Sequence, residues 1–351
     1  MHERQAKESL SLYIFLRKDR TTMRKNHHLS MRQILTSVSI VAAATMSAQI
    51  PDGYYDSLRG KKGAELKTAV HEIIKVANVL DYGSGAGKTW QGFYSTDRLE
   101  NGQCVDRYSN DIRYFTAENT PPSGMNIEHS FPKSWWGGSS NQAYKDLFNL
   151  MPSEIRINSA KANYPMGVVK KSKTDNGCTK VGTGDNGYQL WEPADKWKGD
   201  FARSYMYMAT AYQNFTWKGT QALQILEQND YPTLQEWAYT LYVAWSREDP
   251  VSEMEVTRNN AVCDIQSNRN PYVDFPNLME YVWGDSVDYA FDPSATCCSS
   301  VYKSNNPTSV PQVELEIRPA KVKEPAYMLD GRPYKGVRGK KLMIRNGKKT
   351  L

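Results

Sequence analysis

Apolar residues recur at helical spacing in two segments of this 351-residue chain. Between Gly63 and Ala77 they lie three or four residues apart and share one face of a helix: Leu66, Val70, Ile73, Ile74 and Ala77. The same spacing runs from Phe201 to Tyr212, directly after Asp200, which is a good helix N-cap. Both apolar faces are typical of helices that pack in a core.

Two further helices are predicted from their start signals. Thr233–Glu236 has the sequence of a capping box, and Trp237, Leu241 and Trp245 follow it at helical spacing. Asp249-Pro250 supplies an N-cap and an N1 proline for a helix that we expect to run through Asn260. A glycine-rich segment from Gly83 to Lys88 looks like a phosphate-binding P-loop, but one residue is missing between Gly83 and Gly87-Lys88. We therefore interpret it as an ordinary loop.

The last part of the chain changes in character. Residues 293–317 include a stretch rich in Ser, Asn, Thr and Pro and are predicted to be a linker. In residues 318–351, Asp330-Gly331 and Asn346-Gly347 lie between short apolar runs, which indicates β-hairpins. These patterns predict an α+β protein that is largely helical, with a catalytic domain at 49–292 and a short hairpin-like tail.

Charge is distributed unevenly. Residues 1–48 carry a net charge of +5 and residues 318–351 carry +9, so the chain's +6 leaves −8 for the body between them. A body of this charge excludes a globally basic surface for nucleic acid. Any phosphate contacts must come from a local basic patch or a bound cation.

The N-terminal region has the layout of an export signal. A basic start at Met31-Arg32 precedes an apolar stretch from Ile34 to Met46, which is too short to span a membrane. We expect residues 1–48 to be a signal peptide and the mature chain to begin near Gln49, with residues 1–30 arising from a start codon assigned too early. A buried N-terminal helix is the alternative. Five cysteines fit an oxidising compartment, but their odd number leaves at least one outside any pairing.

Three short motifs carry the candidate chemistry: Asn126–Pro132, Asp146–Pro152 and Arg156–Asn158. The first contains Glu128 and His129, and the third adds the carboxamide of Asn158. An imidazole can deprotonate water near neutral pH, and carboxylate and amide oxygens are ligands that suit Mg²⁺ or Ca²⁺. Adjacent residues of a strand point to opposite faces, so Glu128 and His129 share a site only where the strand ends or bends, as Pro132 indicates.

These motifs resemble those of the bacterial endonuclease I family, secreted or periplasmic nucleases of the ββα-metal superfamily. The resemblance runs in the family's order over roughly residues 52–284 and includes Tyr54–Leu58, Asn163–Pro165, Trp191–Pro193, Lys198–Arg203, Asp249–Ser252 and Ile265–Pro271. Two departures are visible, since the family often has a histidine where Phe148 stands and another where Phe275 follows Asp274. Any role of those histidines does not carry over to this chain.

The resemblance implies a secreted or cell-surface endonuclease that cleaves DNA, with RNA left open, and that acts as a monomer without a membrane span. His129 would be the general base, and Glu128 and Asn158 would bind one divalent ion, Mg²⁺ first, with Ca²⁺ or Mn²⁺ as alternatives. Candidates for nucleic-acid phosphate contacts are Lys133, Arg156, Lys161 and Arg269.

Other interpretations stay open. The tail resembles sorting segments of secreted Bacteroidetes proteins and would then engage a secretion machinery, but its charge also suits nucleic acid. The whole chain could instead be a metal-dependent phosphoesterase for small phosphates. It could also be a non-catalytic binding protein that uses aromatic residues such as Trp135, Trp136 and Tyr164 as a platform.

Overall fold

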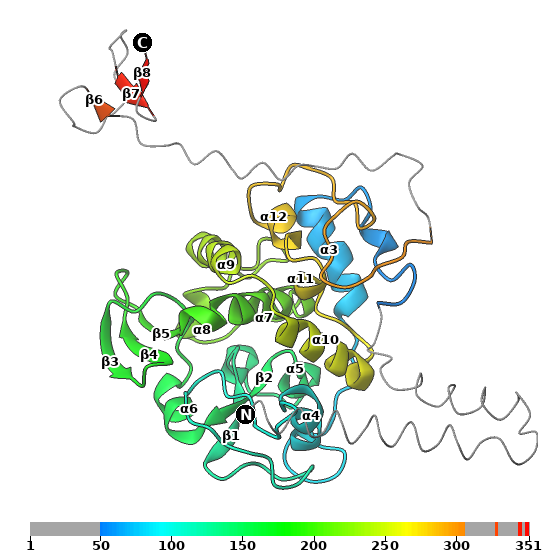
Figure 1. Ribbon diagram of the computed structural model, residues 1–351, viewed down its shortest axis with the longest axis vertical. Helices are drawn as coiled ribbons and strands as arrows, with labels where there is room; N and C mark the ends of the chain where they lie inside the picture. The colour runs from blue at the N-terminus through cyan, green and yellow to red at the C-terminus, as the bar shows by residue number, and fades with distance from the viewer. Residues whose placement is uncertain (1–49, 306–326, 329–342, 346–347, 351) are drawn as a thin grey trace, which may run out of the picture. The chain divides into compact units, whose positions relative to one another are not determined.

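The computed structural model describes residues 50–305, 327–328, 343–345 and 348–350 (Figure 1). The chain divides into a main unit, Met1–Asn306, and a tail unit, Pro307–Leu351. The predicted signal peptide and the Asp330-Gly331 pair lie outside the described residues. Within the described part of the chain, none of the helices has the length and apolar character needed to cross a membrane.

The main unit mixes helices with small antiparallel sheets, as the α+β prediction requires. Its helices are η2 (Asp56–Leu58), α3 (Gly63–Ile74), α4 (Thr89–Thr96), η3 (Lys133–Trp136), α5 (Gln142–Lys145), α6 (Ile155–Lys161), η4 (Asp195–Trp197), α7 (Lys198–Ala211), α8 (Thr220–Leu223), α9 (Glu236–Glu248), α10 (Glu253–Gln266), α11 (Pro271–Asp274) and α12 (Leu278–Val282). Its strands are β1 (Met125–His129), β2 (Leu150–Glu154), β3 (Lys171–Asp175), β4 (Thr179–Thr183) and β5 (Gln189–Pro193).

Helix α7 lies at the centre of the helical part, with α9, α3 and α11 packed against it (Figure 1). Every residue of α7 after Lys198 is buried. A helix buried all round must satisfy its polar side chains inside the protein. Asp200, Arg203 and Thr210 of α7 do so through ion pairs and hydrogen bonds.

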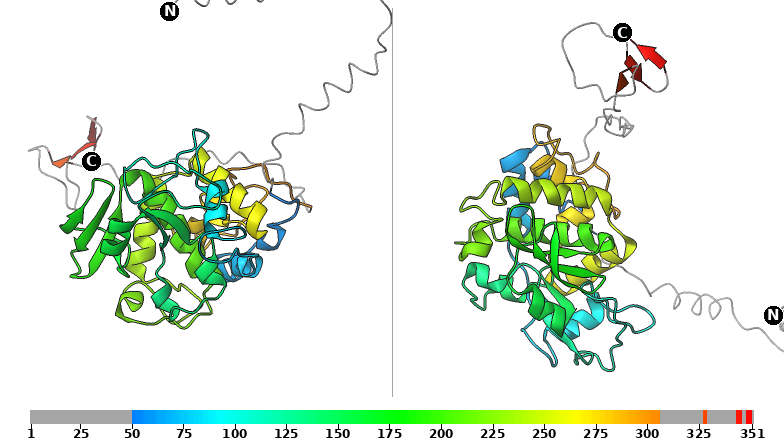
Figure 2. Two further views of the ribbon diagram at one scale, coloured as in Figure 1. Left: turned by 90° about the horizontal axis from the view of Figure 1, so that it is seen from below. Right: turned by 90° about the vertical axis from the view of Figure 1, so that its left-hand side faces the viewer.

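The strands described in the main unit form two separate antiparallel sheets. Strands β3, β4 and β5 pair in sequence order at one edge of the main unit (Figure 2). Strands β1 and β2 form a hairpin in which Met125 pairs with Glu154 and His129 pairs with Leu150. Helix α6 follows β2 directly and packs against both strands. The predicted ββα arrangement is therefore present.

The starts of three predicted helices are wrong. Helix α7 begins at Lys198, so Asp200 lies in its first turn and pairs with Arg107 instead of capping it. Helix α9 begins at Glu236, and Thr233 has a positive φ of 66° and accepts a hydrogen bond from Lys67. Helix α10 begins at Glu253 and is capped by Ser252. In each case a buried tertiary partner holds the residue that the local signal assigned to a cap.

The predicted linker starts too early. Residues up to Asn305 belong to the main unit, because Tyr302 and Ser304 both donate hydrogen bonds to Oδ1 of Asp56. In the tail unit, β6 (Tyr327–Met328) and β8 (Lys348–Thr350) both pair with β7 (Met343–Arg345). The β7–β8 pairing is the one expected on either side of the predicted hairpin, while the Asn346-Gly347 pair itself lies outside the described residues.

Candidate active site

Glu128 and His129 lie at the end of β1, and both are buried. The strand ends at His129. The next residue, Ser130, donates a hydrogen bond from its backbone N–H to the carbonyl of Asn149. Glu128 and His129 are still paired in register with β2, Glu128 with Met151 and His129 with Leu150, and the regular strand ends only after them. Different elements hold the two side chains: Glu128 pairs with Lys161 of α6, and His129 bonds to the carbonyl of Tyr144 in α5.

The carboxylate of Glu128 is held by a buried ion pair. Nζ of Lys161, on the last turn of α6, donates to Oε1 of Glu128 at 2.6 Å, and its exposed fraction is 0%. Burial raises the pKa of Glu128, and the ammonium of Lys161 opposes that rise. Asn158 precedes Lys161 by three residues, so both lie on the same face of α6, and Asn158 is half-buried.

The imidazole of His129 has a defined tautomer. Its Nε2 lies 2.9 Å from the backbone carbonyl oxygen of Tyr144, which can only accept a hydrogen bond. Nε2 must therefore carry the proton, and the lone pair of Nδ1 is left for proton abstraction. Burial lowers the pKa of His129 to about 4, which keeps the ring neutral at neutral pH.

Aromatic side chains enclose the imidazole. The ring of Tyr82 stacks on it with centroids 5.5 Å apart and an interplanar angle of 18°, and Tyr144 lies at 4.7 Å. Trp136 approaches edge-on at 6.3 Å. The contact of Tyr82 and Tyr144 with His129 could not be predicted from the sequence, because these residues lie 47 and 15 positions away and belong to no motif.

Polar residues of the second motif brace this end of the hairpin. The side chain of Asn149 pairs with both backbone groups of Phe131, accepting from N and donating to O. The buried carboxylate of Asp146 accepts from the hydroxyls of Tyr207 and Tyr212, which ties the loop before β2 to the central helix region. These residues position the site and are not themselves placed to react.

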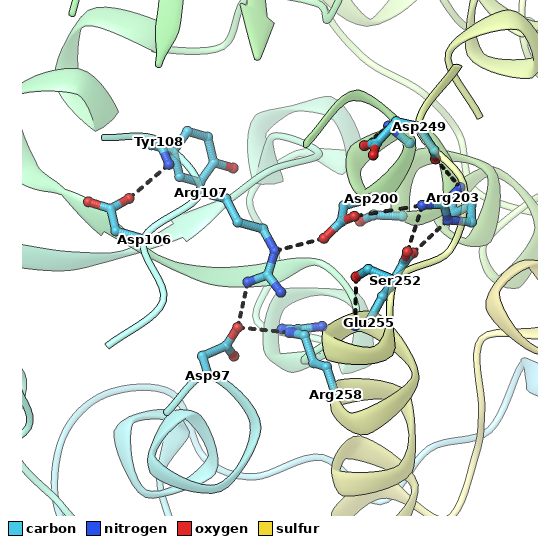
Figure 3. A network of polar contacts seen from close by, with 12 residues as sticks. Asp97, Asp106, Arg107, Tyr108, Asp200, Arg203, Asp249, Ser252, Glu255 and Arg258 are labelled. Carbon is cyan, nitrogen blue, oxygen red and sulfur yellow. Dashed lines mark hydrogen bonds and ion pairs between the residues drawn. The ribbon is translucent and has the colours of Figure 1, made fainter. Parts of the chain in front are cut away.

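A buried ion-pair network contacts the β1–β2 hairpin at the start of β2 (Figure 3). Asp97 binds both Arg107, at 2.7 Å, and Arg258, at 2.9 Å, and Arg107 also binds Asp200 of α7. The guanidinium of Arg258 donates to the carbonyls of Leu147 and Leu150, where β2 begins. The network therefore connects α7 and α10 to the strand that pairs with β1.

The four basic residues predicted to contact phosphate separate into two groups. Lys133 and Arg156 are exposed and can contact a ligand. Lys161 is fully buried against Glu128, with its ammonium 5.1 Å from the ring of Trp191. Arg269 is fully buried and binds Asp274 through Nε and Nη2. We correct the assignment of these two residues, because neither presents its charge at the surface.

Phe148 and Phe275 stand where the resembled family often has histidines. Phe148 is buried and packs on Tyr207 with ring centroids 4.7 Å apart. Phe275 is fully buried and contacts Tyr55 at 5.0 Å. In this chain both positions contribute to aromatic core packing.

The donor set at this site suits a hard cation. Glu128 and Asn158 offer carboxylate and amide oxygens, which Mg²⁺ prefers. Among the described residues, no three His, Cys, Asp or Glu side chains gather into a metal-binding group. All five cysteines are thiols that form no disulfide in the structure.

Comparison with known proteins identifies the family of this chain. The family model of endonuclease I matches residues 62–277. The chain is 29% identical over 276 residues to the extracellular ribonuclease of Bacillus subtilis (strain 168), covering 75% of this chain and 90% of that protein. It is 29% identical over 253 residues to an extracellular ribonuclease of Bacillus amyloliquefaciens (69% and 81%), and 25% identical over 134 residues to an extracellular deoxyribonuclease of Aeromonas hydrophila (38% and 51%).

The matched segment contains the β1–β2–α6 unit, the ion-pair network and every site residue described above. Because the family model spans more than half of the chain, this protein belongs to the endonuclease I family.

Proposed function

We propose that this chain is a secreted, metal-dependent endonuclease that hydrolyses phosphodiester bonds in DNA and RNA without sequence specificity. The observation that carries the proposal is the ββα unit, in which Glu128 and His129 end one strand and α6 brings Asn158 to the same hairpin. The relatives include both ribonucleases and deoxyribonucleases, which supports action on both nucleic acids. All three relatives described above are named as extracellular enzymes, which supports secretion.

In the proposed mechanism, His129 acts as the general base. Nδ1 of His129 takes a proton from the water that attacks phosphorus, while the hydrogen bond to the Tyr144 carbonyl holds the ring in place. The stacked ring of Tyr82 limits rotation of the imidazole and excludes bulk water from one of its faces. Lys133 is exposed, and its ammonium lies 5.2 Å from the ring of Tyr144, whose carbonyl holds His129; in this mechanism Lys133 binds a phosphate oxygen.

Glu128 and Asn158 are the proposed metal ligands, and Lys161 orients Glu128 for this role. A bound divalent ion would neutralise charge on the phosphate and acidify a coordinated water that protonates the leaving oxygen. Burial raises the pKa of Glu128, and the ammonium of Lys161 acts against that rise by favouring the ionised carboxylate.

The activity is tested by incubating the purified protein with plasmid DNA and with RNA, with Mg²⁺ and with excess EDTA. We expect cleavage of both polymers with Mg²⁺ and none with EDTA. Free nucleotides and small phosphate esters serve as the control, because their hydrolysis in place of polymer cleavage would identify a phosphoesterase. Full activity in EDTA would contradict the metal assignment.

The metal ligands are tested by Glu128→Gln and Asn158→Ala. Glutamine keeps the volume and an oxygen for Lys161, whereas alanine would leave a buried ammonium without its partner. Each variant should raise the Mg²⁺ concentration needed for half-maximal cleavage, because each weakens one of few protein ligands. Ser159→Ala, an exposed change on the same helix, is the matched control and should leave the Mg²⁺ titration unchanged. Unaltered titrations in both ligand variants would refute the assignment.

A further inference from the structure

Two segments next to the proposed general base contain no acidic residue. Residues 130–145 and 211–226 include lysines but no Asp or Glu, although residues 49–317 carry a net charge of −8. The first segment contains Trp136, whose ring approaches the imidazole of His129 edge-on at 6.3 Å. The second contains Phe215, whose ring lies 6.3 Å from that of Trp136. Local positive charge, which nucleic acid needs on an acidic body, is therefore present beside His129.

Two of the three lysines in these segments are available to a ligand. Lys145 is not, because its Nζ pairs with Oδ1 of Asp81 at 2.8 Å. Lys133 and Lys218 are exposed, and in the described part of the chain neither has a carboxylate as an ion-pair partner. Nζ of Lys133 lies 5.2 Å from the ring of Tyr144. A neutral ring attracts the ammonium without cancelling its charge, so Lys133 can still bind a phosphate.

Backbone hydrogen bonds hold Lys218 against η3. Its N–H donates to the carbonyl of Trp135 at 2.7 Å. The preceding residue, Trp217, is fixed at both backbone groups by the side chain of Gln228. The side chain of Lys218 lies across Gly137, where its Nζ would be 3.2 Å from a Cβ, and the φ of Gly137 is 88°. Glycine at this position therefore leaves space for the lysine.

Lys133 begins η3, and Gly137 is its C-cap. The turn has a fixed shape, because the N–H of Gly138 donates to the carbonyl of Lys133 and the indole N–H of Trp136 donates to the carbonyl of Ser139. At a rise of about 2 Å per residue, the four steps from Lys133 to Gly137 span about 8 Å. Successive charges of one DNA strand are about 3.4 Å apart along the helix axis. The two exposed lysines can therefore reach different phosphates of the same strand.

We propose that Lys133, Lys218 and the η3 turn between them form a binding surface for the sugar–phosphate backbone of the strand being cleaved. Each ammonium binds a different phosphate beside the one that is attacked at His129. Phosphate contacts carry no sequence information, so this surface holds strands of any sequence in the same way. The inference rests on the proposed function, and it adds Lys218, which belongs to none of the sequence motifs.

The test measures binding separately from cleavage. Fluorescence anisotropy in EDTA follows a short fluorescein-labelled DNA duplex at several salt concentrations, on a His129→Ala background that suppresses cutting. Lys218→Ala and Lys133→Ala are compared singly and together, and Lys218→Arg keeps the charge. Lys171→Ala is the matched control, because Lys171 is an exposed lysine of β3 and its loss changes the net charge equally.

Lys218→Ala and Lys133→Ala should each reduce the slope of log affinity against log salt by about 0.9, because each lysine neutralises one phosphate. The double variant should reduce it by about 1.8. Lys218→Arg and Lys171→Ala should keep the slope of the His129→Ala background. An unchanged slope in Lys218→Ala, or an equal decrease in Lys171→Ala, would overturn the proposed surface.

Cleavage with Mg²⁺ by protein that retains His129 gives a second readout. Lys218→Ala should raise KM more than it lowers kcat, because Lys218 binds the strand away from the reacting atoms. A loss confined to kcat would contradict this role. Failure of the proposed function is seen separately, as absence of DNA and RNA cleavage by the unmutated protein, whereas the salt slopes in EDTA test the surface alone.

Discussion

Replacing His129 by alanine should lower the rate of phosphodiester cleavage by about 10²–10⁴, the usual contribution of a general base. The imidazole is neutral, its proton is fixed on Nε2 by the Tyr144 carbonyl, and Nδ1 remains to accept a proton. The change removes that acceptor and leaves Glu128 and its ion pair with Lys161 intact. Mg²⁺ dependence of the residual activity should therefore be close to that of the unmutated protein.

The measurement is initial cleavage rate on plasmid DNA and on RNA, normalised to folded protein by thermal unfolding. His71→Ala is the matched control. His71, on α3, is also a buried histidine, and its Nδ1 lies 2.9 Å from the backbone carbonyl oxygen of Thr210. It should cost stability and leave the rate per folded molecule unchanged. Retention of nearly full activity by His129→Ala, or equal loss in both variants, would show that His129 is not the base.

The sequence predicted the ββα unit better than the contacts that surround it. Glu128, His129 and Asn158 belong to short motifs, and the order strand, strand, helix follows from their spacing and from the family pattern. The Tyr144 carbonyl that sets the tautomer of His129 could not be predicted, because a backbone group carries no sequence signal. The stacking of Tyr82 depends equally on tertiary folding, which brings residues from distant segments together.

The basic residues show why charge alone predicts function poorly. Arg156 and Arg269 have the same side chain and lie in family-like segments, but Arg156 is exposed and Arg269 is fully buried on Asp274. Arg269 can be buried because it forms an ion pair with a buried carboxylate, and the sequence does not show which arginine has such a partner. Tertiary contacts also explain the wrongly predicted start of α7. Asp200 lies in the first turn and pairs with Arg107, a contact that the local sequence does not reveal.

Arg203→Leu should reduce the free energy of unfolding by about 3–5 kcal/mol, because it leaves a buried carboxylate without its partner. Arg203 is fully buried, and its Nε and Nη2 each bind an oxygen of Glu255 at 2.6 Å. Arg247 provides a matched control on α9, since its Nε and Nη2 bind Glu280 with the same two distances while its side chain is 49% exposed.

Chemical denaturation of the two variants compares the same ion-pair geometry in two environments. Arg247→Leu should cost no more than about 1 kcal/mol, because solvent screens the pair and replaces it. The double variant Arg203→Leu/Glu255→Leu should be less destabilised than Arg203→Leu alone, because it removes the stranded charge. Recovery should be partial, since Arg203 also donates to Ser246 and to the carbonyl of Asp249. Equal costs for Arg203→Leu and Arg247→Leu would show that burial of the network contributes nothing to holding α7 against α10.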